Sequence, residues 1–224
     1  MTIRHTVHAA VLTATIALGC AAAPAAVSAA PAVSATPAVA PEFARTGGDA
    51  LAGYANTALD QWVKYTTTGS ADALAQFRSI RDAVASEAAT RLGMDAAEMQ
   101  AAWRNADDTH QVALLAAFTQ LGTRYRRNAS SPGEGFDCSG LTSWAWGQAG
   151  VSLFHQSKTQ INNAAARTRE TAQAGDLMYY PGHVMLYLGV GNAIVHAPYT
   201  GRNVQVDFVS KNRAKSVRFG DPTA

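Results

Sequence analysis

One cysteine and two histidines of this 224-residue chain, Cys138, His183 and His196, could together act on an acyl group. A thiolate attacks acyl carbon, a histidine serves as its base, and a third group holds the ring of the base. Cys138 lies in the stretch GEGFDCSGLTSWAWGQAG, where a glycine-rich loop gives way to an expected helix. Because the unpaired N–H groups and the dipole of a helix start favour an anion, we expect the pKa of the Cys138 thiol to be lowered.

The two histidines fall on neighbouring strand-like runs, HVMLYLGV and AIVHAPY. If Val190 and Gly191 form the two-residue turn of a hairpin, His183 faces Pro198, and His196 lies two positions along on the same face. Diagonal neighbours of this kind are within reach of aromatic side chains, so one imidazole could orient the other. A bulge that shifts the register by one residue would place the two histidines on opposite faces.

The N-terminal segment predicts export. Residues 1–30 combine Arg4, an apolar run from about Val7 to Gly19, and small residues that suit signal-peptide cleavage around residues 27–29. Residues 31–44 are typical of a Pro/Ala linker, too poor in large apolar groups to pack. The apolar run falls short of the roughly 20 residues of a transmembrane helix, and no later stretch approaches that length. We therefore expect an exported protein without a transmembrane segment.

The only other cysteine, Cys20, lies inside this signal. Lipid anchoring through Cys20 is not favoured, because Leu18 is bulky where a lipobox normally has a small residue. Removal of the signal then leaves Cys138 unpaired in an exported protein. Such a cysteine pairs between molecules, lies buried and inert, or reacts. The expected helix start and the two histidines favour a reactive thiol.

The chain divides into two halves of opposite charge. Residues 42–120 hold 6 basic and 10 acidic residues, a net charge of −4, whereas residues 121–224 hold 11 basic and 6 acidic residues, a net charge of +5. The acidic half is predicted to be helical over residues 45–108, with apolar residues such as Leu51 and Tyr54 at helical spacing. We expect no catalytic group there, and the charges would allow this helical region to dock on the basic half.

Capping residues indicate where these helices begin and end. Ser70 is a candidate N-cap with Gly93 just beyond the end of its helix, and Asp95 opens the next helix with Glu98 three residues on. A fourth helix is expected to start near Thr109.

In the basic half, the spacing of apolar residues changes from that of helices to that of short strands. After the helix at Cys138, the runs GDLMYY, HVMLYLGV, AIVHAPY, NVQVDFV and KSVRFG follow one another, separated by Gly, Pro and Asn turns. One helix followed by hairpin-connected strands indicates an α+β domain with an antiparallel sheet. The predicted fold class is therefore α+β, preceded by a small all-helical region.

The string YRRNASSPGEGFDCSGLTSWAWGQAG, then SLFHQSKTQ, then AGDLMYYPGHVMLYLGVGNAIVHAP, resembles the NlpC-type cell-wall cysteine peptidases, bacterial enzymes with a papain-like core. The resemblance runs from about Ala113 to Ala224, and the ordered set DCSGL, GDL, GHV and HAP carries it. It implies a catalytic domain over residues 109–224, with the cysteine on its first helix and the histidine on its sheet. By this alignment Cys138 is the nucleophile, His183 the general base and His196 the residue that orients the base.

Four further residues are implied by the resemblance as oxyanion or substrate contacts. Tyr125 matches a tyrosine whose hydroxyl lies near the reacting centre. Asp137 and Ser139 flank the nucleophile and contact the substrate peptide in some relatives, although a local turn or capping role for Asp137 is an alternative. Gln160 matches a glutamine of an R-S-x-x-Q-like stretch, in which Phe154 and His155 here replace the common proline and arginine.

The resemblance implies a secreted cell-wall hydrolase, a cysteine endopeptidase that cuts peptidoglycan stem peptides. The usual bond in the family joins D-γ-glutamate to the diamino acid at position three, which makes the enzyme a DL-endopeptidase. Two alternatives stay open: an N-acetylmuramoyl-L-alanine amidase, and a non-catalytic wall-binding or regulatory protein on the same scaffold. The intact set of Cys138, His183 and His196 argues against the second of these.

No cofactor, metal or nucleic acid is expected. His183 and His196 lack a carboxylate or thiolate at metal-ligand spacing, and the sequence has no phosphate loop or nucleic-acid motif. The expected partner is the peptidoglycan stem peptide, and the expected state is a monomer. A basic run near the C-terminus is interpreted as a solvated edge, with contact to anionic wall polymers as the alternative. Its members are Lys211, Arg213, Lys215 and Arg218.

Overall fold

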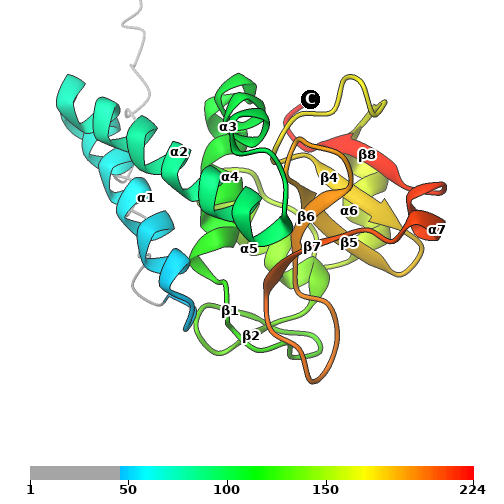
Figure 1. The fold of residues 1–224 in the computed structure, drawn as a ribbon. Coiled ribbons are helices and arrows are strands. Elements are labelled where there is room, and N and C mark those ends of the chain that lie inside the picture. The colour runs from blue at the N-terminus through cyan, green and yellow to red at the C-terminus, as the bar shows by residue number, and fades with distance from the viewer. Residues whose placement is uncertain (1–45) are drawn as a thin grey trace, which may run out of the picture. The chain divides into compact units, whose positions relative to one another are not determined.

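The structure, a computed structural model, describes residues 46–224. The expected signal at residues 1–30, the linker at residues 31–44 and Cys20 lie outside the described residues. Within the described part, seven helices and eight strands follow one another. Figure 1 shows their arrangement and labels all of them except β3. None of the helices between residues 46 and 224 combines the length and the apolar character that a membrane crossing needs.

Four helices form the first part of the described chain: α1 (Ala50–Thr68), α2 (Ala71–Leu92), α3 (Ala96–Asn105) and α4 (Asp108–Thr119). Their ends confirm the predicted caps. The Ser70 hydroxyl accepts a hydrogen bond from the Ala73 N–H, and the Asp95 carboxylate accepts one from the Glu98 N–H. Gly93 ends α2 with a φ of 63°, a left-handed conformation that glycine adopts at little cost.

These helices share one apolar core with the rest of the described chain. Helix α4 is buried from His110 to Thr119 and packs between α1 and α5 (Cys138–Gln148). Helix α3 reaches the sheet through Trp103, whose indole N–H donates to the Leu188 carbonyl at 3.1 Å. Ahead of α1, the Gly47 N–H donates to the Thr119 carbonyl at 2.7 Å. The helical region is thus joined to the sheet-bearing region by buried side chains and by backbone hydrogen bonds.

Six strands form an antiparallel sheet in the order β3, β8, β4, β5, β6, β7. Their bounds are β3 (Ala165–Arg167), β4 (Leu177–Tyr180), β5 (His183–Tyr187), β6 (Ala193–His196), β7 (Gln205–Phe208) and β8 (Arg218–Asp221). Helix α5 packs against β5 and β6, and α6 (Ser157–Asn163) packs against β4 and β5. The predicted α+β fold with an antiparallel sheet is confirmed.

Some elements lie outside the predicted runs. A small hairpin of β1 (Ser130–Ser131) and β2 (Gly135–Phe136) precedes α5, and the short helix α7 (Lys211–Ala214) follows β7. The last strand, β8, pairs with β4 instead of β7, with Met178 opposite Phe219. After β7 the chain therefore does not add a further strand beside β7. It crosses to the opposite end of the sheet, where β8 lies between β3 and β4.

The register of β5 on β6 is the one predicted from the turn. Leu186 pairs with Val195, and Tyr187 pairs with Ile194. Gly189 and Gly191, which both have positive φ, lie in the connection between the two strands. No bulge intervenes between the paired residues, so His183 and His196 lie on the same face, as expected.

Candidate active site

Cys138 is the first residue of α5, and Asp137 caps the helix. The Asp137 carboxylate accepts from the Gly140 N–H at 2.7 Å, which confirms the capping alternative for this residue. Cys138 is partly buried and has no disulfide partner among residues 46–224. The backbone N–H of Val184 hydrogen-bonds its sulfur, and Val184 directly follows His183. The start of the helix thus brings the thiol to the first residues of β5.

Asp137 accepts further hydrogen bonds from three other groups. The Ser139 hydroxyl and His155 Nε2 donate to its Oδ1 at 3.1 and 2.8 Å, and the Asn128 N–H donates to its Oδ2 at 2.8 Å. The contact with His155, which requires a proton on Nε2, was not predicted from the sequence. No periodic signal connects residues 18 positions apart when one of them lies in a loop. These bonds hold the residue next to the nucleophile in one orientation.

The imidazoles of His183 and His196 contact each other edge to face. Nε2 of His183 lies 2.9 Å from Nδ1 of His196, and the rings are inclined at 76°. Both residues are buried, at 7% and 8% exposure. Because Nε2 of His183 is used by His196, Nδ1 is the nitrogen left to face the thiol. Nε2 of His196 has no hydrogen-bond partner among the described residues and lies 3.9 Å from the Asp207 carboxylate.

Burial governs the protonation of this site. It raises the pKa of the Cys138 thiol, and the hydrogen bonds from N–H groups of Val184, Ser139 and Cys138 offset this only in part. The prediction of a lowered thiol pKa is therefore wrong, because the desolvation of the anion outweighs the helix start. Burial, together with the charge of His196 and then of Arg213, lowers the pKa of His183 to about 3. At neutral pH the thiol and the imidazole are both uncharged, so His183 is available as a base.

Two tyrosines lie near the thiol. Burial and then the charges of Cys138 and Asp137 raise the pKa of Tyr125, so its hydroxyl lies within electrostatic range of the sulfur. Tyr180, which the sequence analysis did not select, is the cross-strand partner of His183. Their ring centroids are 5.3 Å apart. Tyr180 could have been found only from the pairing of β4 with β5.

Gln160 and Ser139 use their polar groups within the protein. Gln160 is 1% exposed, and its amide nitrogen donates to the carbonyls of Ser139 and Phe154 at 2.9 and 2.8 Å. Its amide oxygen accepts from the Thr142 hydroxyl at 2.6 Å. Ser139 is buried against Asp137. In this arrangement Gln160 fastens the loop at Phe154 to α5.

A second histidine cluster lies between α4 and the sheet. Nε2 of His110 is 3.0 Å from the Asp176 carboxylate and 3.3 Å from the Asp221 carboxylate, and all three residues are buried. These groups are close enough to hold a cation, but the Arg167 guanidinium already lies 2.6 Å from Asp221. The direct contacts therefore act as a polar link between the helix and the sheet. Because His110, Asp176 and Asp221 lie far apart in the sequence, their spacing gave no indication that they would cluster.

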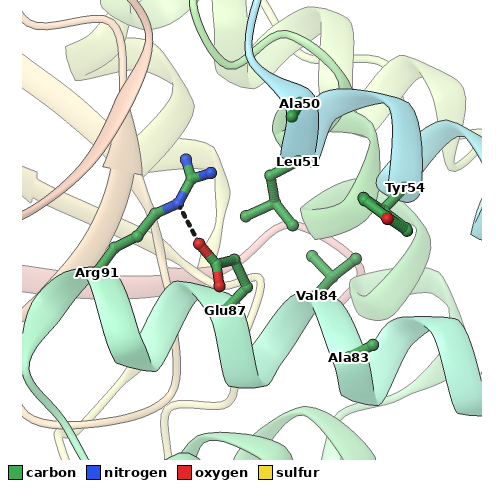
Figure 2. A pocket seen from close by; sticks show the side chains of 7 residues that line it. All are labelled: Ala50, Leu51, Tyr54, Ala83, Val84, Glu87 and Arg91. Atoms are coloured by element: carbon green, nitrogen blue, oxygen red, sulfur yellow. Dashed lines mark hydrogen bonds and ion pairs between the residues drawn. The ribbon is translucent and has the colours of Figure 1, made fainter.

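A separate hollow of about 380 Å³ opens between α1 and α2 (Figure 2). Leu51 and Val84 contribute to its apolar lining, and Glu87 and Arg91 form an ion pair at its edge, at 3.0 Å. Arg91 also pairs with Asp49 at 2.8 Å. The charged residues that line the hollow, Glu87 and Arg91, are thus both in ion pairs. None of the residues that line the hollow belongs to the site at Cys138.

The fold and the site define an α+β domain with a cysteine at the start of a helix and a pair of histidines on the antiparallel sheet that this helix packs against. Residues 122–220 match the model of the NlpC/P60 family. A probable endopeptidase of Corynebacterium glutamicum is 35% identical over 142 residues, which cover 62% of this chain and 59% of the relative. The chain thus spans less than two thirds of the length of that relative.

Shorter matches carry more specific names. A bifunctional muramidase/DL-endopeptidase of Bacillus subtilis is 32% identical over 38% of this chain and 28% of its own length. A gamma-D-glutamyl-L-lysine dipeptidyl-peptidase of Bacillus cereus is 34% identical over 35% of this chain and 26% of its own length. A solved NLP/P60 structure from Staphylococcus aureus is 31% identical, covers 51% of this chain and 42% of its own, and gives a TM-score of 0.44.

The low pKa values of the two histidines predict a loss of stability in acid. The pKa falls from 6.5 to about 3 for His183 and to about 4 for His196, so below pH 6.5 the unfolded chain binds protons that the folded protein excludes. Stability contributed by these residues is complete above pH 6.5 and is lost as the pH falls toward 4, on the order of a few kcal/mol.

Thermal unfolding measured from pH 7 to pH 4 checks this expectation. Carboxylates elsewhere also titrate in that range, so a His183→Gln variant serves as the reference. We expect its melting temperature to fall less steeply with pH than that of the unchanged protein. Equal slopes in the two proteins would contradict the burial of a neutral imidazole at this position.

Proposed function

We propose that this protein is an exported peptidoglycan endopeptidase that cleaves the stem peptide by a Cys-His-His mechanism. One observation carries the proposal: Nε2 of His183 and Nδ1 of His196 lie 2.9 Å apart on the strands against which the helix beginning at Cys138 packs. This arrangement supports the assignment of a thiol, a base and a group that orients the base to residues of α5, β5 and β6. The match of residues 122–220 to the NlpC/P60 family and the endopeptidase name of the Corynebacterium glutamicum relative support the same class of reaction.

The reaction begins from the neutral pair. Nδ1 of His183 takes the thiol proton as the Cys138 sulfur attacks the peptide carbonyl, and the imidazolium then gives that proton to the leaving amine. A thioester remains on Cys138, and water hydrolyses it with His183 again acting as base. His196 accepts a hydrogen bond from Nε2 of His183, which fixes the tautomer whose Nδ1 carries the lone pair. Because His183 is buried, its charged form is short-lived and is held by this bond.

The carbonyl oxygen of the substrate becomes negatively charged during the attack, so hydrogen-bond donors are needed to stabilise it. The Cys138 N–H at the start of α5 and the Tyr125 hydroxyl are the two groups that we assign to it. The dipole of α5 points its positive end at the same place. Asp137, held by four donors, keeps the first turn of the helix in position for both steps.

The bond that we propose joins D-γ-glutamate to the diamino acid at position three. The relatives named as a DL-endopeptidase and as a gamma-D-glutamyl-L-lysine dipeptidyl-peptidase support this choice. The catalytic groups themselves act on any amide, so the residues around Cys138 must select the bond. The export signal predicted for residues 1–30 supports action outside the cytoplasm on the cell wall.

Mass spectrometry of muropeptide digests tests the bond. We expect products that retain L-Ala-D-Glu on the muramic acid side, together with peptides that begin at the diamino acid. The Cys138→Ala protein, treated in parallel, should give none of them. Stem peptides released whole from the sugar would show an amidase instead, and no digestion by the unchanged protein would argue for a binding function.

A further inference from the structure

Arg213 of α7 is an exposed cation that stacks on a residue of the candidate active site. Its guanidinium carbon lies 4.5 Å from the ring centroid of Tyr180. None of the ion pairs among residues 46–224 involves Arg213. The nearby Asp207 carboxylate accepts from Gln205 and from the Phe208 N–H. The charge of Arg213 is therefore held in one place by an aromatic ring and is free to meet an anion.

Tyr180 connects this cation to the reacting groups. Its ring lies 5.3 Å from that of His183, which it faces across the β4–β5 ladder. Burial raises the pKa of the Tyr180 hydroxyl, while the charge of Arg213 lowers it and the charge of Cys138 raises it. The guanidinium and the sulfur thus both act on one hydroxyl. Arg213 lies within electrostatic range of His183 as well, on which its charge has a direct effect.

The order of these groups indicates which part of a substrate Arg213 meets. The base that protonates the leaving amine must lie on the side of the leaving group. From His183, the proposed base, the ring of Tyr180 leads outward to the guanidinium of Arg213, so Arg213 lies on the side of the base. In the reaction proposed above, the leaving group begins with the diamino acid at position three. The end of its side chain carries either an ammonium, as in lysine, or an ammonium and a carboxylate, as in diaminopimelate.

We propose that Arg213 is a specificity-determining residue that binds the side-chain carboxylate of the diamino acid and so selects diaminopimelate-type stem peptides over lysine-type ones. The inference rests on the proposed function, which it extends to the choice of substrate. A guanidinium pairs with a carboxylate through parallel hydrogen bonds, whereas it repels the ammonium of lysine. Lys211, exposed on the same short helix, adds to the positive potential there.

Three peptides that differ at one group test the proposal. Each has the sequence L-Ala-D-γ-Glu-X-D-Ala, where X is meso-diaminopimelate, the same residue with its side-chain carboxylate amidated, or L-lysine. We expect the unchanged protein to have the highest kcat/KM on the free diaminopimelate peptide. Arg213→Ala should lower that value roughly five- to tenfold and leave the amidated peptide unaffected. Arg213→Glu should shift the preference toward lysine.

Lys215→Ala is the matched control, because it removes an exposed cation of the same segment, whereas the cation stacked on Tyr180 is Arg213. It should keep the preference of the unchanged protein. If Arg213→Ala cleaves all three peptides with the unchanged ratio, the inference is overturned while the proposed function stands. If the unchanged protein cleaves none of them, the proposed function fails and this inference with it.

Discussion

Replacement of Cys138 by alanine should abolish peptide hydrolysis, with a loss on the order of 10⁴-fold or more. The sulfur forms the thioester in the proposed mechanism, so no neighbouring group can supply its function. Hydrolysis of purified muropeptides, followed by the release of new amino groups, gives the measurement. Circular dichroism and a thermal melt should show a folded protein, because the residue is only partly buried and its backbone remains at the start of α5.

Ser143→Ala is a matched control on the same helix, since the Ser143 hydroxyl only donates to the Gly140 carbonyl. Its activity should stay close to that of the unchanged protein. A thiol-directed alkylating agent should inactivate the unchanged protein in step with the labelling of Cys138. Digestion at the normal rate by a folded Cys138→Ala protein would rule out the thiol mechanism.

The second large effect is expected at the two histidines, and it should be unequal. Loss of a general base lowers the rate by about 100- to 10,000-fold, so His183→Ala should be almost inactive. His196 acts through His183, and its removal frees the ring of the base without removing the base. We therefore expect His196→Ala to retain more activity than His183→Ala when kcat/KM is compared on one peptide.

His196→Asn distinguishes orientation from simple packing. Its amide oxygen can still accept a hydrogen bond from Nε2 of His183, so this variant should recover part of the activity that His196→Ala loses. Similar small losses in both alanine variants would mean that the roles are wrongly assigned. A His196→Asn protein no better than His196→Ala would restrict His196 to a packing role.

The elements that could be predicted from sequence are those set by local signals. Ser70, Gly93 and Asp95 mark helix ends through their own side chains or through their freedom of φ, and each lies at the predicted end. The predicted register of the β5–β6 hairpin, which brings His183 to His196, is confirmed, although the tight turn has Gly191 and Asn192 in its centre instead of Val190 and Gly191. The register could be predicted because a hairpin leaves few ways to pair its strands.

What depends on the surroundings of a residue could not be predicted in this way. Tyr54 has the helical spacing of a core residue, yet it is 59% exposed at the edge of the hollow between α1 and α2 (Figure 2). The thiol pKa of Cys138 was expected to fall, but burial raises it, and burial is a property of the packed chain. Contacts such as His155 with Asp137, or Arg213 with Tyr180, join loops and short elements whose sequences carry no period.

The backbone contacts ahead of α1 bear on how this domain can be recombined with others. Gly47 lies so close to the turn after α4 that a Cβ there would be 1.8 Å from the Leu121 carbonyl oxygen. On the other side of the helices, the Trp103 indole holds the Leu188 carbonyl, directly beyond the strand that begins with His183. A chimera that joined a foreign module at residue 108 would cut through this arrangement. A foreign module joined before Gly47 would leave these contacts intact, so the unit to transfer includes the helices and the sheet together.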